Sequence, residues 1–71
     1  MKALMIRLHD GTVYDTENNV IVTNITYLFP HGQAPWFVVT TDTSEGIHHI
    51  RVEDDDVQHV NWDLSFMGKK K

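Results

Sequence analysis

Short runs of β-branched and aromatic residues, each closed by turn residues, are the feature that most constrains this chain. The longest run reads VIVTNITYL from Val20 to Leu28, and another reads WFVVTTD from Trp36 to Asp42. Such side chains pack well on the pleated surface of a strand. No long stretch shows the 3.6-residue apolar period of a helix. The sequence therefore predicts an all-β domain.

The remaining strand candidates are also short runs of alternating apolar and polar residues that are bounded by turn residues. They are Lys2 to Leu8, Thr12 to Tyr14, Ile47 to Val52 and Val57 to Trp62. In the first of them, Leu4, Ile6 and Leu8 fall on one face and are expected to point into the core. The last is expected as a strand or as a single helical turn that leads into one. The resulting arrangement is an antiparallel meander of about five or six strands.

The chain is short enough for one domain only, because domains seldom form from fewer than about 50 residues. We expect residues 1–66 to form that domain and residues 67–71 to be a flexible basic tail. At this length the sheet is expected to curl into a small barrel or a tight sandwich, since closure removes strand edges that invite pairing with other chains. The chain has no cysteine, so disulfides contribute nothing to its stability.

The order of these parts resembles that of small SH3-like or Sm-like barrels. The chain opens with a strand, the turn pair Asp10-Gly11 and a second strand. Near its end, IRVEDDDVQHV (Ile50 to Val60) resembles the one-turn element that feeds the last strand of such barrels. The resemblance is one of pattern over most of the chain. It implies a binding module more than an enzyme, and it assigns no functional residue.

The charge of the chain is unevenly distributed. The formal net charge is −4, but Lys69, Lys70 and Lys71 supply three of the six cations. Residues 1–68 thus carry three cations against ten anions, a formal charge of −7. A charge of that sign repels nucleic acid and anionic membranes at long range. It favours a protein partner with a basic surface and makes nucleic acid an unfavourable one.

A run of four acids is the first candidate contact for such a partner: Glu53, Asp54, Asp55 and Asp56. The alternative is a solvated turn that keeps a sheet edge soluble. In the functional interpretation, several carboxylates at phosphate-like density compete for a site that normally holds nucleic acid. Asp42, Glu45 and Asp63 extend the run into a stripe if the fold gathers them.

An aromatic loop is the second candidate. Phe29 begins a segment rich in proline and glycine, and Trp36 follows it. Because neighbouring strand residues point to opposite faces, Trp36 and Phe37 cannot both enter one core. One of them is expected to be at least partly exposed, and we assign Phe29 and Trp36 to partner binding. The alternative is that these rings cap the core; Trp62 and Phe66 raise the same question.

The chain shows no constellation that specifies catalysis. Its five histidines are His9, His31, His48, His49 and His59. His48 and His49 are adjacent and point to opposite faces of a strand, so we interpret the histidines as surface residues. The alternative is a metal site assembled from His49, His59 and a nearby acid. We assign no catalytic residue, no metal ligand and no cofactor.

We therefore expect a non-enzymatic protein-binding module. One form of this hypothesis is a phage or mobile-element inhibitor or accessory protein whose acidic surface engages a nucleic-acid-handling protein. A second hypothesis is an Sm-like, self-assembling structural homo-oligomer. A third is a nucleic-acid-binding barrel that uses Tyr14, Tyr27, Trp36 and Arg51 as stacking and phosphate contacts. No segment approaches the ~20 apolar residues of a membrane span, and no signal peptide is recognisable, so we expect a cytoplasmic protein.

Overall fold

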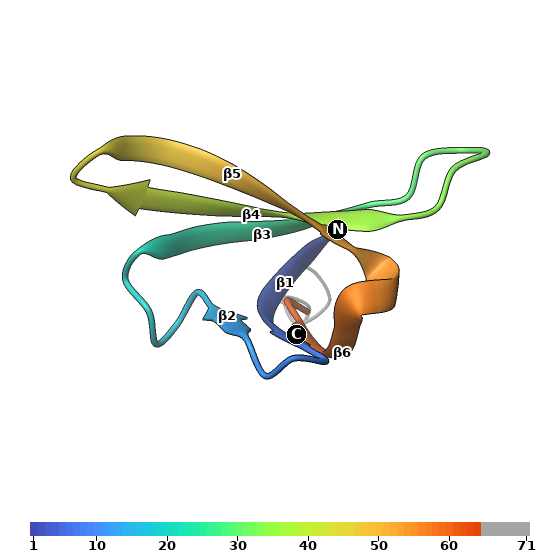
Figure 1. The fold of residues 1–71 in the computed structure, drawn as a ribbon, viewed down its shortest axis with the longest axis horizontal. Helices are drawn as coiled ribbons and strands as arrows, with labels where there is room; N and C mark the ends of the chain where they lie inside the picture. The colour runs from blue at the N-terminus through green and yellow to red at the C-terminus, as the bar shows by residue number, and fades with distance from the viewer. Residues whose placement is uncertain (65–71) are drawn as a thin grey trace, which may run out of the picture.

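The computed structural model describes residues 1–64, which form six strands and one short 3-10 turn (Figure 1). The strands are β1 (Lys2–Leu8), β2 (Val13–Asp15), β3 (Val22–Leu28), β4 (Trp36–Thr43), β5 (Gly46–Glu53) and β6 (Val57–Trp62). The turn η1 (Asp54–Asp56) connects β5 to β6. The prediction of an all-β fold with antiparallel strands is confirmed. Phe66 and the basic segment 67–71 lie outside the described residues.

All six strands belong to one antiparallel sheet with β1 at its centre. The strand order is β2-β1-β3-β4-β5, and β6 pairs with the other edge of β1. Lys2 and Ala3 of β1 pair with β3, whereas Met5 to Arg7 pair with β2. Strands β2 and β3 therefore share one edge of β1. In Figure 1, β3, β4 and β5 form one layer, and β1, β2 and β6 lie beneath it.

The sheet is not closed into a barrel, and the predicted closure is therefore not observed. The turn η1 bends the chain sharply between Glu53 and Val57. Strand β6 consequently leaves β5 and runs along β1, from Trp62 opposite Ala3 to Val57 opposite Leu8. Within residues 1–64, the edge of β5 that faces away from β4 has no strand partner. Strand β3 pairs with β4 from Trp36 to Thr41, so only the tip of the β4–β5 hairpin extends past β3 (Figure 1).

The core lies between the two layers. Its buried apolar residues are Ala3, Ile6, Val22, Ile25, Phe37, Val39 and Val52. The predicted inward set of the first strand was partly wrong, because Ala3 and Ile6 are buried while Leu4 and Leu8 are only half-buried. A register shift against β6 between Ala3 and Met5 interrupts the alternation. An extra residue at such an irregularity moves the following side chains to the other face.

Strand β3 begins two residues later than the sequence predicts, because side-chain hydrogen bonds hold the preceding residues in a turn. The Asp15 carboxylate accepts hydrogen bonds from the Glu17 N–H (2.9 Å) and the Asn18 side-chain amide (2.8 Å). The Asn19 side-chain oxygen accepts one from the Ile21 N–H (3.1 Å). Asx turns of this kind compete with strand pairing. Val20 is consequently 94% exposed instead of lying in the strand.

No helix in residues 1–64 has the length and apolar character needed to cross a membrane.

Candidate functional site

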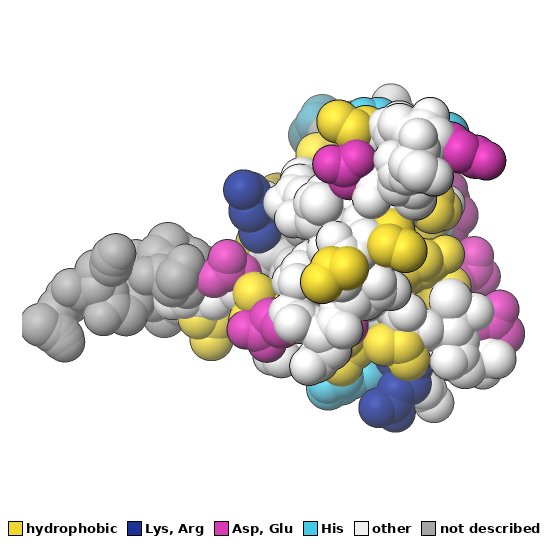
Figure 2. Space-filling model, turned by 90° about the vertical axis from the view of Figure 1, so that its left-hand side faces the viewer, with side chains coloured by type: hydrophobic (Ala, Val, Ile, Leu, Met, Phe, Trp, Pro, Cys, Tyr) yellow, Lys and Arg dark blue, Asp and Glu magenta, His cyan; other side chains and the backbone are white. Residues whose placement is uncertain are grey.

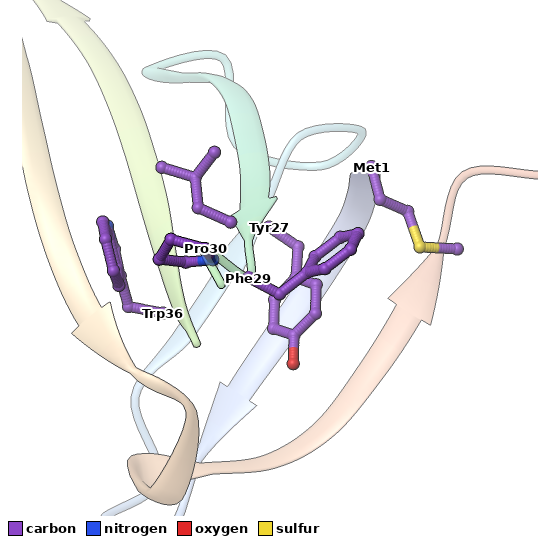
Figure 3. Close-up of a pocket in the computed structure, with 6 residues that line it drawn as sticks. Met1, Tyr27, Phe29, Pro30 and Trp36 are labelled. Atoms are coloured by element: carbon purple, nitrogen blue, oxygen red, sulfur yellow. The ribbon is translucent and has the colours of Figure 1, made fainter. Parts of the chain in front are cut away.

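An open apolar groove lies at the end of the sheet where β3 runs into the loop before β4. Its volume is about 490 Å³. Its lining residues are Met1, Tyr27, Leu28, Phe29, Pro30 and Trp36. Figure 3 shows the labelled side chains as a row that extends from Met1 to Trp36. Phe29 is 65% exposed and Met1 is 54% exposed, so the groove presents large apolar groups to solvent.

The floor of the groove is an aromatic cluster centred on Tyr27. The Tyr27 ring centroid lies 4.6 Å from that of Phe37 and 5.3 Å from that of Trp62. Phe29 packs against the outer side of Tyr27 at 5.6 Å. Tilted and edge-on ring pairs at these separations are favourable beyond the area that they bury. The groove therefore rests on side chains that the core holds in place.

Trp36 and Phe37 point to opposite faces of β4, as the sequence predicts. Phe37 is 1% exposed and belongs to the core, whereas Trp36 is half-buried on the outer face. The guanidinium carbon of Arg51 lies 4.0 Å from the Trp36 ring centroid, within the range of a cation–π contact. Arg51 also forms an ion pair with Glu53, the residue opposite Trp36 on β5. The Arg51 guanidinium therefore covers one face of the indole.

The same contacts bear on the nucleic-acid hypothesis. Trp36 and Arg51, two of its four expected contact residues, lie against each other. Glu53 balances the charge of Arg51, and one face of the indole is covered by the guanidinium. Tyr14 lies on β2 opposite Ile6, and Tyr27 forms the floor of the groove. The four side chains therefore do not form one exposed cationic and aromatic surface.

The predicted acidic run lies directly beside the groove. Its last three residues form η1. We call Glu53 and η1 together the acid turn. The Tyr27 hydroxyl donates a hydrogen bond to Asp54 Oδ1 (3.3 Å), and the Asp54 N–H donates to the Pro35 carbonyl (3.3 Å). Asp55 and Asp56 are exposed. All six residues that the sequence assigns to partner binding are thus brought to one end of the molecule.

The other acids considered as extensions of this surface lie elsewhere. Asp42 is six residues along β4 from Trp36, which corresponds to about 20 Å at the rise of a strand. Glu45 lies in the turn of the β4–β5 hairpin, still further from η1. Asp63 follows β6, and its N–H donates to the Lys2 carbonyl (3.0 Å) on the Met1 side of the groove. Asp42 and Glu45 therefore do not join the acid turn.

Sequence reasoning missed one acid of this end of the molecule. Asp10 shares a second, smaller cavity of about 280 Å³ with Leu8, His9 and Asp56. The His9 N–H donates to the Asp56 carbonyl (3.0 Å), which joins the first turn of the chain to η1. The Thr12 N–H donates to the Asp10 carboxylate (2.8 Å) and lowers the pKa of that carboxyl. Asp10 thus adds an ionised group beside the acid turn at neutral pH.

The histidines are dispersed over the described part of the chain. His48 and His49 alternate along β5, and His49 Nδ1 lies 3.1 Å from the Thr40 hydroxyl. His59 lies opposite Arg7 on the β1–β6 pair. Within residues 1–64, no three histidine, aspartate or glutamate side chains are close enough together to hold a metal ion.

Comparison with known proteins gives no match: no protein-family model, no curated protein and no solved structure matches this chain.

The contact between Tyr27 and Asp54 gives a pH prediction. Burial of the ring raises the pKa of Tyr27 above its ordinary value of 10.0, and the charge and hydrogen bond of Asp54 add to the rise. Above pH 10 the unfolded chain loses the tyrosine proton more readily than the folded chain does, so ionisation of Tyr27 favours unfolding. The contribution of Tyr27 to stability is therefore complete below pH 10 and is lost as the pH rises through the folded-state pKa.

We expect Tyr27→Phe to lose less stability than the wild type between pH 9 and pH 11. Urea unfolding at a series of pH values measures the difference between the two chains, so that all other titrating groups cancel. Parallel stability curves for the two chains contradict the burial of the Tyr27 ring and its contact with Asp54.

Proposed function

We propose that this chain is a non-enzymatic protein-binding module whose groove and acid turn together bind a segment that carries both apolar and basic side chains. The observation that carries the proposal is the direct connection between the two features. Asp54 accepts a hydrogen bond from Tyr27 on the groove floor and donates one to Pro35 at the rim. A segment that fills the groove therefore also meets the acid turn.

The chemistry of each half supports a mixed partner. Exposed phenylalanine, tryptophan and methionine side chains gain most from burying the apolar groups of a partner, and aromatic residues are common anchors at interfaces. The acid turn contributes charge instead, because Asp54, Asp55 and Asp56 lie within one turn. Carboxylates at the rim of an interface accelerate association and select partners of opposite sign. Neither half alone distinguishes a basic and apolar segment from other ligands.

We propose further that the partner is a nucleic-acid-handling protein and that the chain acts as an inhibitor or accessory protein of the phage or mobile-element type. Support comes from the acidic body and from the compact charge of the acid turn, which suits a surface made to receive phosphates. The strand order, with η1 feeding the last strand along β1, also supports kinship with SH3-like or Sm-like barrels in an open form.

Selection of peptides from a random library by the immobilised full chain tests the proposed function. We expect the enriched peptides to combine lysine or arginine with aromatic or large aliphatic residues, and to bind more weakly as salt rises. Enrichment of acidic peptides, or affinities that salt does not change, would contradict the proposal. So would a failure to enrich any sequence over an uncoated support.

A second candidate function is self-assembly, which the opposite end of the molecule favours. Val20 is 94% exposed, Ile47 is 64% exposed, and Ile21 is exposed as well. The Ile21 carbonyl accepts a hydrogen bond from the N–H of Asp42, which pairs with Ile47, so Ile21 lies beside the hairpin. Figure 2 faces this end and shows hydrophobic side chains between acidic ones. The edge of β5 is available on the same hairpin, and unpaired edges are templates for strand addition.

If the chain assembles through this end, light scattering after size exclusion gives a mass of several subunits, and Val20→Ser with Ile47→Ser reduces it to one. These substitutions remove apolar contact area and keep the net charge. A monomeric wild type at high concentration excludes self-assembly and leaves the groove and acid turn as the functional surface.

A further inference from the structure

We propose that the free edge of β5 is a second docking site, where an extended segment of a basic partner pairs with β5 as an additional strand. This site goes beyond the proposed function, because the edge and the groove are different surfaces. They adjoin at the acid turn, where Glu53 of β5 lies opposite Trp36 of the groove. The edge determines the conformation of what binds there, since a row of unpaired backbone groups matches another extended backbone.

The backbone groups of alternate β5 residues point away from β4. The Asp42 N–H donates to the Ile21 carbonyl (2.9 Å), on the β3 side of β4. Asp42 pairs with Ile47, and because Asp42 directs its backbone groups away from β5, Ile47 directs its own away from β4. Since such pairs alternate along the ladder, the outward groups belong to Ile47, His49, Arg51 and Glu53. Within residues 1–64 no strand pairs with this side of β5, the outer strand of its layer in Figure 1.

Strand β5 lacks the features that protect the edges of soluble sheets. Such edges are commonly short or bulged, or carry proline or lysine. Strand β5 has eight residues, none of them proline or lysine, and its register with β4 runs without interruption. The other outer strands differ, because β2 has three residues and β6 has two register shifts against β1. Among the described strands, β5 therefore has the edge best suited to strand addition.

The charge around this edge selects a basic occupant. Residues 42–56 include the end of β4, the hairpin turn, β5 and η1, and they carry six acids and one cation. Their formal charge of −5 is most of the −7 of residues 1–68. The acids lie at both ends of β5, with Asp42 and Glu45 at the hairpin turn and the acid turn at the other end. A segment with lysine or arginine at each end therefore complements the edge in charge.

The side chains of β5 indicate what the middle of the segment contains. Ile47 is 64% exposed, and Ile50 is half-buried against the core. These two isoleucines lie on opposite faces of the strand, because side chains alternate. An added strand places its own side chains directly beside those of β5 on both faces, where β-branched residues pair favourably. The edge thus fits an apolar, β-branched strand that is flanked by basic residues.

A second copy of the chain fits this edge less well. Antiparallel pairing of β5 with itself brings the acid turn of each chain toward the hairpin turn of the other, which carries Glu45. Parallel pairing brings the two acid turns together. Either arrangement places like charges side by side, which destabilises a strand pair. The charge therefore favours a basic segment over a second copy.

A designed peptide tests strand addition at this edge: alternating valine and threonine, as long as β5, with two lysines at each end. Hydrogen exchange of the ¹⁵N-labelled full chain is followed by nuclear magnetic resonance. We expect slower exchange at the amides of Ile47, His49 and Arg51, whereas those of His48 and Ile50, which face β4, change little. With the peptide at about 10 times its dissociation constant, exchange should slow by about 10-fold, because only the unbound chain exchanges.

Two variants and a second peptide separate strand addition from other binding. His49→Pro removes an N–H that faces the free edge and keeps the hydrogen bonds to β4, so the slowing should be lost. Asp42→Lys with Glu45→Lys reverses the charge at the hairpin turn and should weaken binding of the lysine-ended peptide by about 10-fold. A peptide of the same charge with proline at its centre presents no continuous strand edge and should leave exchange unchanged.

Three outcomes would overturn the inference. Slowing that is absent, or that does not alternate along β5, means that no strand pairs with this edge. Slowing that the proline-containing peptide also produces means that binding does not require an extended backbone. Slowing that increases with the concentration of the chain alone, without peptide, means that a second copy occupies the edge. In each case, peptides selected by the immobilised chain still test the groove and the proposed function independently.

Discussion

Replacing Phe37 by alanine is expected to lower the free energy of unfolding by about 3–5 kcal/mol, the usual cost of removing a buried phenyl ring. The side chain is 1% exposed and contacts both Tyr27 and Trp62. Its loss leaves a cavity under the groove floor that the two remaining rings fill only in part. Because single domains are stable by only about 5–15 kcal/mol, and small ones lie at the low end, the variant should be largely unfolded at 37 °C.

Phe29→Ala is the matched control for this prediction, because the chemical change is the same and the environment differs. Phe29 is 65% exposed and packs against Tyr27. We expect it to change stability by less than about 1 kcal/mol, as surface substitutions usually do. Urea unfolding followed by far-UV circular dichroism measures both variants. Equal losses would show that Phe37 does not occupy the core as described.

The second large effect is expected at the acid turn. Asp55→Lys combined with Asp56→Lys should weaken the binding of a selected basic peptide by about 10-fold or more at physiological salt, which corresponds to about 1.4 kcal/mol. Both side chains are exposed, so the substitutions reverse charge without disturbing the core. Attraction becomes repulsion at the rim, and most of the effect is expected on the association rate. Surface plasmon resonance measures both rates.

Asp42→Lys combined with Glu45→Lys makes the same change in net charge at the other end of the β4–β5 hairpin. Asp42 lies about 20 Å from the acid turn along the strands, more than twice the Debye length of about 8 Å at physiological salt. We expect the control to change the affinity by less than about 3-fold, because only residual long-range steering is lost. Equal weakening by the two double variants would mean that net charge, rather than the acid turn, controls binding.

The strands could be read from the sequence because their signals are local. Runs of β-branched residues and the turn at Thr43 to Gly46 place β4 and β5 almost to the residue. The interruption of alternation in β1 could not be read, since it depends on how β6 pairs with it. The late start of β3 reflects hydrogen bonds of Asp15 and Asn19 that override the strand preference of Val20 and Ile21.

The candidate site shows the same division between local and long-range information. Phe29, Trp36 and the four acids stand out by residue type alone. Their assembly depends on the register that sets Trp36 opposite Glu53 and on the turn that brings Asp54 to Tyr27. Met1 was not predicted as a lining residue, because nothing local distinguishes it from an ordinary apolar position. The open sheet was missed for a related reason, since closure depends on how sharply η1 turns the chain.

The central claim is that the groove and the acid turn form one binding surface, and mapping a selected peptide onto the ¹⁵N-labelled full chain by chemical shift tests it most directly. The account predicts that shifts concentrate at Tyr27, Leu28, Phe29 and Trp36 and at Asp54 to Asp56, and that both groups titrate with the same dissociation constant. Shifts confined to the β4–β5 hairpin, or groove and acid turn responding with different constants, would contradict it.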